Sequence, residues 1–497
     1  MEPNPPTLSP ADAWEPLPAT EWNESAARHL LQRVGFSAVP VELERALRDG
    51  PAQTLERYFA TMPAFPKPSA IAQLEADSPQ SAQRLTAGNA ALKRQAAQEA
   101  RESSREALFD LTIRWLQLAR RPENSPAEKW LLFLSDVWVV SAEKVKNSAL
   151  IFQHQGLLRQ FALGSGVSLA KAVSRSPAMV LYLDLQPSRQ AAPNENFARE
   201  LFELFTLGEG HYSENDIKQA ARAFTGYRQR EGRFFYDERQ HDAGEKTLFG
   251  HRGRFTGDDV IRLVFQQKAS GSFLPNEMAR FYLCDAPLPA EYTDELGAWW
   301  ARENHDLRKL ALKFFGSRLF FSPLYRGGYI KSPVQFYLGL LQDLNLSVAP
   351  LPRQVIGSLR QMGQLPFDPP NVRGWVGGRA WINSATLAAR RQLIHTVLQP
   401  LNEEALNGDE KMLLAAANAE GVNNFAFSPA QLTEWAQLPA AERARKLVRR
   451  YVPGLAGTAL EGQLIAYLER SSRHDQSDSV TRAALATLLE SPGYQLC

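Results

Sequence analysis

Cysteine is scarce in this chain, and long apolar runs are missing. Only Cys284 and Cys497 occur among the 497 residues, which is too few for a disulfide framework or a cysteine-rich metal site. No stretch approaches the roughly 18 uninterrupted apolar residues that a membrane-spanning helix needs. The first residues also lack the basic and apolar segments of a secretory signal peptide. We therefore expect a cytoplasmic protein without a membrane span.

An excess of charge of one sign is also missing. The chain has 56 lysines and arginines against 54 aspartates and glutamates, so its formal net charge is only +2. A nucleic-acid-binding protein usually shows a basic stripe interleaved with aromatic residues, whereas the basic run at 443–450 is typical of one solvated helix face. We expect no nucleic-acid partner.

Local signatures of several common enzyme classes are absent from the sequence. It has no phosphate-binding P-loop, no nucleophile elbow of the α/β-hydrolase type, no His-Glu-x-x-His zinc motif and no Cys-x-x-Cys pair. These absences exclude the enzymes that depend on those motifs. They leave open a site built from carboxylates and histidines, because such a site needs no local motif.

Helical periodicity is what the sequence has in abundance. It predicts a mostly α fold, with a flexible N-terminus at 1–20 and a single large helical body at 21–497 that carries irregular Pro/Gly/Trp-rich loops. Besides a helix at 24–35, we expect helices at 126–143, 147–163, 167–174, 194–206, 213–224, 257–268, 275–283, 290–302, 306–315 and 331–344. Strand signals are few. At most one short β-hairpin is expected near 233–249, in which 233–236 pairs with 247–249.

Two parts of the helical body stand out. Residues 81–120 form a long helical pattern with few apolar residues in its first half, which predicts a helical arm that projects from the body. This arm is either a solvated insertion or a partner-binding surface. Residues 428–497 return to amphipathic helices and are expected to form a C-terminal helical subregion.

The densest group of polar residues lies at 193–210. In an α-helix, Asn196, Glu200 and Glu203 would share one face. Two carboxylates on one face can bind a hard divalent cation, or can hold one protonated carboxyl beside an ionised one for acid–base catalysis. The alternative is structural, with an i, i+4 ion pair between Arg199 and Glu203 and a helix start that is capped by the preceding residues.

A polar loop at 240–250 holds a histidine, an aspartate and a lysine around a glycine. Imidazole beside carboxylate is the minimal pairing for a general base, and it also suits a metal ligand with its supporting partner. If this loop meets the polar helix in space, we predict a divalent-metal set of Glu200, Glu203, His241 and Asp242. The corresponding catalytic set is Glu195, Glu200, His241, Asp242 and Lys246. A turn that carries a surface histidine is the alternative.

The segment 365–383 is too rich in proline, glycine and tryptophan for regular structure and predicts an ordered loop. Trp375 and Trp381 could form a platform for a sugar ring or another flat ligand. Hydrogen bonds beside it would come from Asn371, Arg373 and Asn383. In the alternative, the tryptophans are buried and fasten the loop to the body.

Several of these segments together carry a resemblance. The motifs stand in order at 26–36 (AARHLLQRVGF), 182–184 (YLD), 194–208 (NENFARELFELFTLG), 223–226 (AFTG), 241–250 (HDAGEKTLFG), 331–333 (KSP), 369–375 (PPNVRGW), 381–383 (WIN) and 491–495 (SPGYQ). In them the chain resembles the bacterial family called domain of unknown function 1800, from about residue 24 to the end.

The resemblance implies a helical bacterial protein without an established reaction. Its gene often lies beside that of a commonly exported, sulfatase-like family, which implies a role in cell-envelope or polysaccharide biology. A sulfatase-like protein and a glycan are therefore the expected partners. The resemblance also implies a shared polar site at His29, Asn194, Glu195, Asn196, Arg199, Glu200, His241, Asp242 and Lys246. Of these, we expect His29, Asn194, Asn196 and Arg199 to bind ligand, together with Asn371, Trp375, Trp381 and Asn383.

The chain departs from the family pattern at three positions. Members typically carry Trp-His-Asn-His-Phe where this chain has Ser135 and Val137 in place of the two histidines, and a further histidine is Phe205 here. These side chains cannot transfer protons or bind metal as an imidazole does. We therefore favour a binding or scaffold protein that is a degenerate family member. The alternative is a hydrolase or transferase with a carboxylate–histidine site, metal-dependent or not, that acts on a polar envelope glycan.

Overall fold

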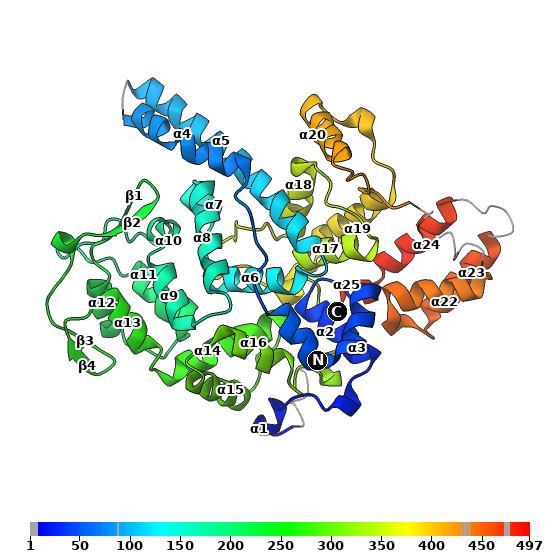
Figure 1. Cartoon of the computed structure of the whole chain (residues 1–497), viewed down its shortest axis with the longest axis horizontal. Coiled ribbons are helices and arrows are strands. Elements are labelled where there is room, and N and C mark those ends of the chain that lie inside the picture. Colours follow the sequence, from blue (N-terminus) through cyan, green and yellow to red (C-terminus); the bar gives the residue numbers. More distant parts are fainter. Residues whose placement is uncertain (1–7, 87–88, 429–430, 432–434, 436–437, 472–477) are drawn as a thin grey trace.

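The computed structural model describes residues 8–86, 89–428, 431, 435, 438–471 and 478–497. Its fold is mostly α, as the sequence predicts, and Figure 1 shows the arrangement of the elements. The first part of the chain holds α1 (Pro10–Ala13), η1 (Ala19–Glu21), α2 (Glu24–Val34), α3 (Pro40–Tyr58), α4 (Ser69–Thr86), α5 (Ala90–Arg120), α6 (Ser125–Val137), α7 (Ala142–Val145), α8 (Ser148–Phe161), α9 (Gly166–Ser174) and α10 (Pro177–Tyr182).

The middle part of the chain holds the elements of the predicted site. They are α11 (Asn196–Glu200), η2 (Leu201–Thr206), α12 (Glu214–Ala223), β1 (Tyr227–Arg230), β2 (Arg233–Tyr236), η3 (Glu238–Gln240), β3 (Lys246–Leu248), β4 (His251–Gly253) and α13 (Gly257–Val264). Figure 1 shows α11 to α13 and both pairs of strands at one end of the body, with α22 to α24 at the other end.

The remaining elements complete the body. They are α14 (Lys268–Tyr282), α15 (Ala290–Arg302), α16 (Leu307–Phe315), η4 (Pro323–Tyr325), α17 (Pro333–Asp343), α18 (Pro352–Met362), η5 (Gly378–Trp381), α19 (Ser384–Leu398), η6 (Glu403–Ala405), α20 (Gly408–Ala419), α22 (Ala440–Tyr451), η8 (Pro453–Leu455), α23 (Ala459–Ser471), α24 (Asp478–Glu490) and α25 (Pro492–Gln495). Among the longer helices, the sequence analysis missed α3, α18, α19 and α20. Helix α18 carries a recognisable signal, because it begins at a proline and ends at Gly363, whose φ is 98°.

Two helices form the centre of the body, because nearly every residue of α6 and of α17 is buried. A helix without a polar face belongs in a core. Helix α6 brings two carboxylates there, Glu128 and Asp136. Glu128 is held by two nitrogens of Arg159 at 2.5 and 2.8 Å and by the Trp115 indole N–H at 2.9 Å. A buried charge is tolerated only with such partners. One hydrophobic core extends from Ala13 to Tyr494.

Helices α4 and α5 form a hairpin that extends away from the body (Figure 1). The predicted arm at 81–120 therefore consists of two helices, and α5 begins after Asn89, whose side chain caps it. The buried residues of α5 lie mainly in its inner half, among them Leu111, Trp115 and Leu116. This distribution matches the scarcity of apolar residues in the outer half.

The strands form two hairpins, and the pairing differs from the prediction. Strand β2 pairs with β1 in an antiparallel register that sets Arg233 opposite Arg230, and β3 pairs with β4. The expected pairing of 233–236 with 247–249 is therefore wrong. The turn between β1 and β2 lies at Glu231 and Gly232, both with positive φ, which is typical of a two-residue hairpin turn.

The N-terminal segment differs from the expected flexible one. Residues 1–7 lie outside the described residues, whereas Trp14 is buried and its indole N–H donates to the Tyr292 carbonyl at 2.7 Å. This contact fastens the segment to α15. Among the helices of the described ranges, none combines the length and the apolar character that crossing a membrane requires.

Candidate functional site

The predicted site helix changes its winding in the middle. Helix α11 leads directly into η2, which is a π-helix. A π-helix closes its hydrogen bonds over five residues instead of four, so the α-helical spacing assumed for Asn196, Glu200 and Glu203 does not hold beyond Glu200. Short π-helical segments are frequent at functional sites.

The apolar side of this segment is buried and fixes its position. Phe197 packs on Phe224 with ring centroids 4.8 Å apart, and Phe202 packs on Phe249 at 5.3 Å. These contacts tie the segment to the end of α12 and to the turn between β3 and β4. The polar side chains of the segment consequently face away from the core.

Arg199 is held by two carboxylates. Its two terminal nitrogens donate to the two oxygens of Glu214 at 2.9 and 2.8 Å, and Glu195 lies 3.3 Å away. The hydrogen bonds from Arg199 lower the pKa of Glu214. Within the described part of the chain, the expected pair of Arg199 with Glu203 is not formed.

Glu203 pairs with an arginine of the aromatic loop instead. The Nη2 atom of Arg373 lies 3.0 Å from an oxygen of Glu203 and 3.0 Å from an oxygen of Glu209. The second oxygen of Glu203 accepts the Tyr212 hydroxyl at 3.1 Å. Arg373 therefore joins two segments that lie 170 residues apart in the sequence.

Glu200 lies near both arginine groups. Burial and the neighbouring charge of Glu203 raise the pKa of Glu200, and the charges of Arg373 and Arg199 oppose this shift. Across the described ranges, its carboxylate takes part in no hydrogen bond and no ion pair. Glu200 is thus a half-buried carboxylate. The two arginines near it form their ion pairs with other carboxylates.

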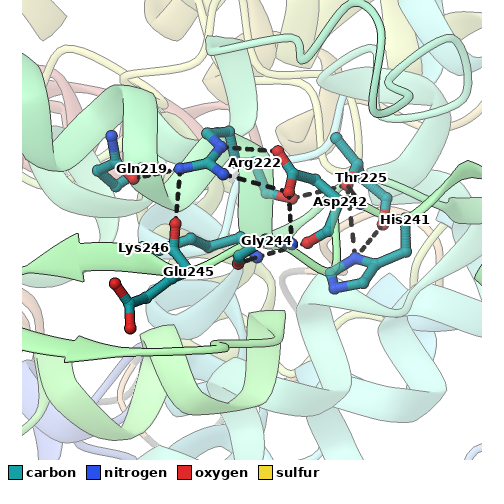
Figure 2. Close-up of polar contacts among 8 residues, drawn as sticks. All are labelled: Gln219, Arg222, Thr225, His241, Asp242, Gly244, Glu245 and Lys246. Carbon is teal, nitrogen blue, oxygen red and sulfur yellow. Dashed lines mark hydrogen bonds and ion pairs between the residues drawn. The ribbon is translucent and has the colours of Figure 1, made fainter.

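Figure 2 shows a second polar group, which we call the loop cluster: Arg222, Thr225, His241, Asp242 and Lys246. Asp242 accepts from Arg222 at 2.6 Å (Nε) and 3.2 Å (Nη2), and from the Gly244 N–H at 2.8 Å. Although burial opposes it, these hydrogen bonds lower the pKa of Asp242. Asp242 is therefore an ionised partner of Arg222.

Lys246 and His241 are also satisfied by the main chain. The Lys246 ammonium donates to the carbonyls of Asp242 and Gly244 at 2.5 and 3.0 Å, and burial lowers its pKa. The Nδ1 atom of His241 lies 3.1 Å from the Thr225 carbonyl, to which it donates when it carries the proton. Burial lowers the pKa of His241 as well.

Two glycines are needed for this geometry. Gly226 has a φ of 83°, and a Cβ atom there would lie 2.5 Å from the Asp237 carbonyl oxygen. At Gly244 a Cβ atom would come within 2.9 Å of both Arg222 and Asp242. The glycines in the sequence motifs at 223–226 and 241–250 therefore allow the backbone to approach the loop cluster closely.

The two polar groups do not combine into the predicted metal site. In the described residues, no set of three or more His, Cys, Asp or Glu side chains is arranged to hold a metal ion. The charges that shift the pKa of Glu200 come from Glu203, Arg373 and Arg199, whereas those acting on His241 come from its own loop. The predicted metal set and catalytic set are accordingly divided between two separate groups.

The remaining polar residues of the resemblance have structural contacts. Asn194 accepts the Asn196 N–H at 2.9 Å and donates to the Asp184 carbonyl at 3.2 Å, so it holds the start of α11. The side chain of Asn196 lies 3.4 Å from the Asp184 carboxylate. His29 is buried in the core on α2, where its Nε2 atom lies 2.8 Å from the Phe320 carbonyl.

Both tryptophans of the aromatic loop are buried. Trp375 exposes 3% and Trp381 exposes 7% of its surface, so neither presents an open face to a sugar ring. The main-chain N–H of Trp375 donates to the Asp136 carboxylate at 2.8 Å. Asn371 accepts the Arg373 N–H, and Asn383 caps α19. This is the geometry of the alternative in which the tryptophans fasten the loop to the body.

The three positions at which the resemblance implies histidines lie within the body. Ser135 donates to the Leu131 carbonyl at 2.9 Å and to Gln155 at 3.1 Å. Val137 is buried. Phe205 is 2% exposed and packs on Trp138 with ring centroids 5.3 Å apart. Two of the three positions are therefore apolar and buried, and the third is a hydrogen-bonded serine.

The sequence analysis missed three residues that organise these groups. Arg222 neutralises Asp242, and Glu214 holds Arg199. Asp136 accepts from Trp375 and pairs with Arg280 at 3.3 Å, and burial raises its pKa to about 6. A signal for Asp136 was available, because it lies between the two positions that lack histidine. No local pattern indicates the partners of Arg222 or Glu214.

Comparison with known proteins gives a single result. A family model described as "Protein of unknown function (DUF1800)" matches residues 29–496. No curated protein matches the chain, and no solved structure matches it. The match covers the polar helix, the loop cluster and the aromatic loop.

Proposed function

We propose that this chain, which belongs to the DUF1800 family of proteins of unknown function, is a binding protein that recognises a polar ligand around Glu200. The observation that carries the proposal is the half-buried Glu200 carboxylate, which has no partner among the described residues. A carboxylate accepts hydrogen bonds from hydroxyl groups. An unpaired acceptor in a half-buried position gains from a ligand that supplies them.

The surroundings of Glu200 support a preformed surface. Arg199 and Arg373 each pair with two carboxylates, and together they form a charged frame beside it. A frame that is ordered before binding loses little conformational entropy when the ligand arrives. Hydroxyl-rich glycans fit this chemistry, in line with the cell-envelope or polysaccharide role that the family resemblance implies. A sulfatase-like protein is a candidate partner for the same reason.

Binding without catalysis is favoured by the state of the other groups. The loop cluster uses its ionisable side chains to neutralise one another and to hold main-chain carbonyls. Proton transfer by imidazole is lost at Ser135, Val137 and Phe205. These observations support a family member that keeps a polar surface but lacks the histidines.

A second candidate function rests on Glu200 as well. A carboxyl with a raised pKa beside another carboxylate, here Glu203, is the arrangement of a proton donor in glycoside hydrolysis. In this alternative the chain is a hydrolase or transferase that acts on a polar envelope glycan, with Glu200 as the acid.

An array of bacterial envelope glycans separates the two candidates. We expect the purified chain to bind a subset of the array and Glu200→Ala to lose that binding. The matched control is Glu44→Ala, since Glu44 is an exposed glutamate on α3. Release of reducing ends from the bound glycan by the wild type, abolished in Glu200→Gln, would establish the enzyme instead. Equal binding by the wild type and Glu200→Ala would contradict the binding proposal, and a wild type that releases no reducing ends from a glycan it binds would contradict the enzyme.

Two further predictions concern the setting of the protein. Cell fractionation tests the expected cytoplasmic location. Co-purification with the sulfatase-like neighbour, compared between the wild type and a chain with α4 and the outer half of α5 deleted, tests whether the arm is a partner-binding surface.

A further inference from the structure

A cavity of about 460 Å³ lies between α2, the segment after α14, the segment around η4 and the aromatic loop at η5. Its lining includes Arg33, Asp285, Tyr325 and Arg379. Binding cavities for small molecules commonly measure about 300–1,000 Å³. None of these residues belongs to the Glu200 surface or to the loop cluster, so the cavity is a separate feature of the molecule.

Arg33 is a buried cation with incomplete partners. It is 1% exposed, and its terminal nitrogens donate to the carbonyls of Tyr282, Leu283 and Tyr325 at 2.9, 3.1 and 2.5 Å. Its Nε atom is buried and has no hydrogen-bond partner among the residues that the structure describes. No ion pair of Arg33 occurs within the described ranges. A buried guanidinium that forms no ion pair is costly unless something compensates it.

Two further donors line the same cavity. The hydroxyl of Tyr325 takes part in no hydrogen bond in the part of the chain that the structure describes, and Arg379 is exposed and forms no ion pair there. The carboxylate of Asp285 also lines the cavity; burial raises its pKa, and the charges of Arg379 and Arg33 oppose this shift. The cavity lining therefore contains two guanidinium groups and one carboxylate, which leaves an excess of positive charge. The nearby thiol of Cys284 is uncharged, because burial raises its pKa to about 11.

We infer that this cavity binds a small organic anion, a carboxylate or a phosphate monoester with an apolar body, whose oxyanion lies among Arg33, Arg379 and the Tyr325 hydroxyl. Charged oxygen acceptors make the strongest hydrogen bonds with guanidinium groups. The rest of the lining suits an apolar body, because it is formed by Leu283, Ala286, Leu324, Tyr329 and Ile330. The ring of Tyr329 also lies under the Arg33 guanidinium, 4.6 Å from it.

Calorimetric titration with four probes tests this inference. Benzoate and phenyl phosphate carry the two oxyanions, and benzamide and phenol are their neutral counterparts. We expect saturable binding of at least one anion and none of the neutral probes. Benzoate alone would identify a carboxylate site, and phenyl phosphate alone a phosphate site.

Two cavity variants and one control locate the binding. Tyr325→Phe removes only a hydroxyl and should weaken anion binding about tenfold, the usual effect of a hydrogen bond to a charged group. Arg379→Gln should weaken it about threefold, because this side chain is exposed. Arg353→Gln, at an exposed arginine on α18, should change nothing. Arg33 itself is not replaced in this titration because its bonds hold three segments together.

Three results would overturn the inference. The first is no saturable binding of either anion to the folded wild type. The second is binding of benzamide as tight as that of benzoate. The third is equal affinity in the wild type and in both cavity variants, provided that circular dichroism shows all of them folded.

Discussion

Lys246 in the loop cluster and Arg33 at the cavity are two buried cations that rest on main-chain carbonyls. Lys246 is 2% exposed and Arg33 is 1% exposed. Each donates to more than one carbonyl oxygen. They differ in their surroundings. Lys246 lies close to the charge of the Asp242 carboxylate. Arg33 lines a cavity, and one of its N–H groups has no acceptor in the described part of the chain.

The comparison separates two uses of a buried charge. Most buried polar groups in proteins are fully hydrogen-bonded, so burial alone does not indicate a binding site. The loop cluster follows that rule and serves to hold the strand β3 and the end of α12 together. The exception at Arg33 coincides with a cavity, and that coincidence is what suggests a ligand.

Removing Arg33 should have the largest effect on stability. In Arg33→Leu three buried carbonyls lose their donor, and each loss costs on the order of 1 kcal/mol or more. We expect the free energy of unfolding to fall by about 3 kcal/mol in urea denaturation. A loss below about 1 kcal/mol would mean that water replaces the guanidinium, and the contrast with the loop cluster would then disappear.

Breaking the Arg222–Asp242 pair should come next. Asp242→Ala leaves Arg222 without its carboxylate and the Gly244 N–H without an acceptor. The guanidinium is partly exposed and recovers some hydration, so we expect a loss of about 2 kcal/mol in the same denaturation experiment. An unchanged midpoint would show that the loop cluster does not hold this end of the body.

The pH dependence of the loop cluster should be weaker but of defined sign. Burial lowers the pKa of His241 below its usual 6.5. The unfolded chain then takes up a proton at a higher pH than the folded protein does. The stabilisation from His241 is therefore complete above 6.5 and decreases as the pH falls through 6.5 towards the lowered value.

The measurement compares the wild type with His241→Asn at about pH 7.5 and at about pH 5. Burial also lowers the pKa values of His29, His154 and His305, so both proteins lose stability on acidification. We expect the wild type to lose more. An equal loss in the two proteins would mean that His241 titrates alike in the folded and unfolded states.

The smallest effect is expected at an exposed pair beside the loop cluster. Glu245 pairs with Arg252, and both side chains are more than half exposed. Such pairs contribute about 0.5 kcal/mol or less, so Glu245→Gln should leave the denaturation midpoint nearly unchanged. A large loss of unfolding free energy would mean that the exposed pair stabilises this loop as much as the buried charges do.

Much of the fold could be predicted from local sequence, but the site could not. The ranges expected for α15 and α16 agree with the structure to within one residue at each end, because helical periodicity and capping act over a few neighbouring residues. For the site, the sequence correctly placed polar groups on one helix and one loop. The sequence left two alternatives for Trp375 and Trp381, a ligand platform and burial in the core, because tryptophan is suited to both.

The sequence by itself determined the mostly α class, the polar segments and membership in the DUF1800 family, since these depend on short patterns and on their order along the chain. Only the tertiary structure decided which charges meet. Arg222 reaches Asp242 across 20 residues, Arg373 reaches Glu203 across 170, and Arg33 reaches the Tyr325 carbonyl across 292. Burial and ion pairing depend on distances in space, and no periodicity in the chain encodes those distances.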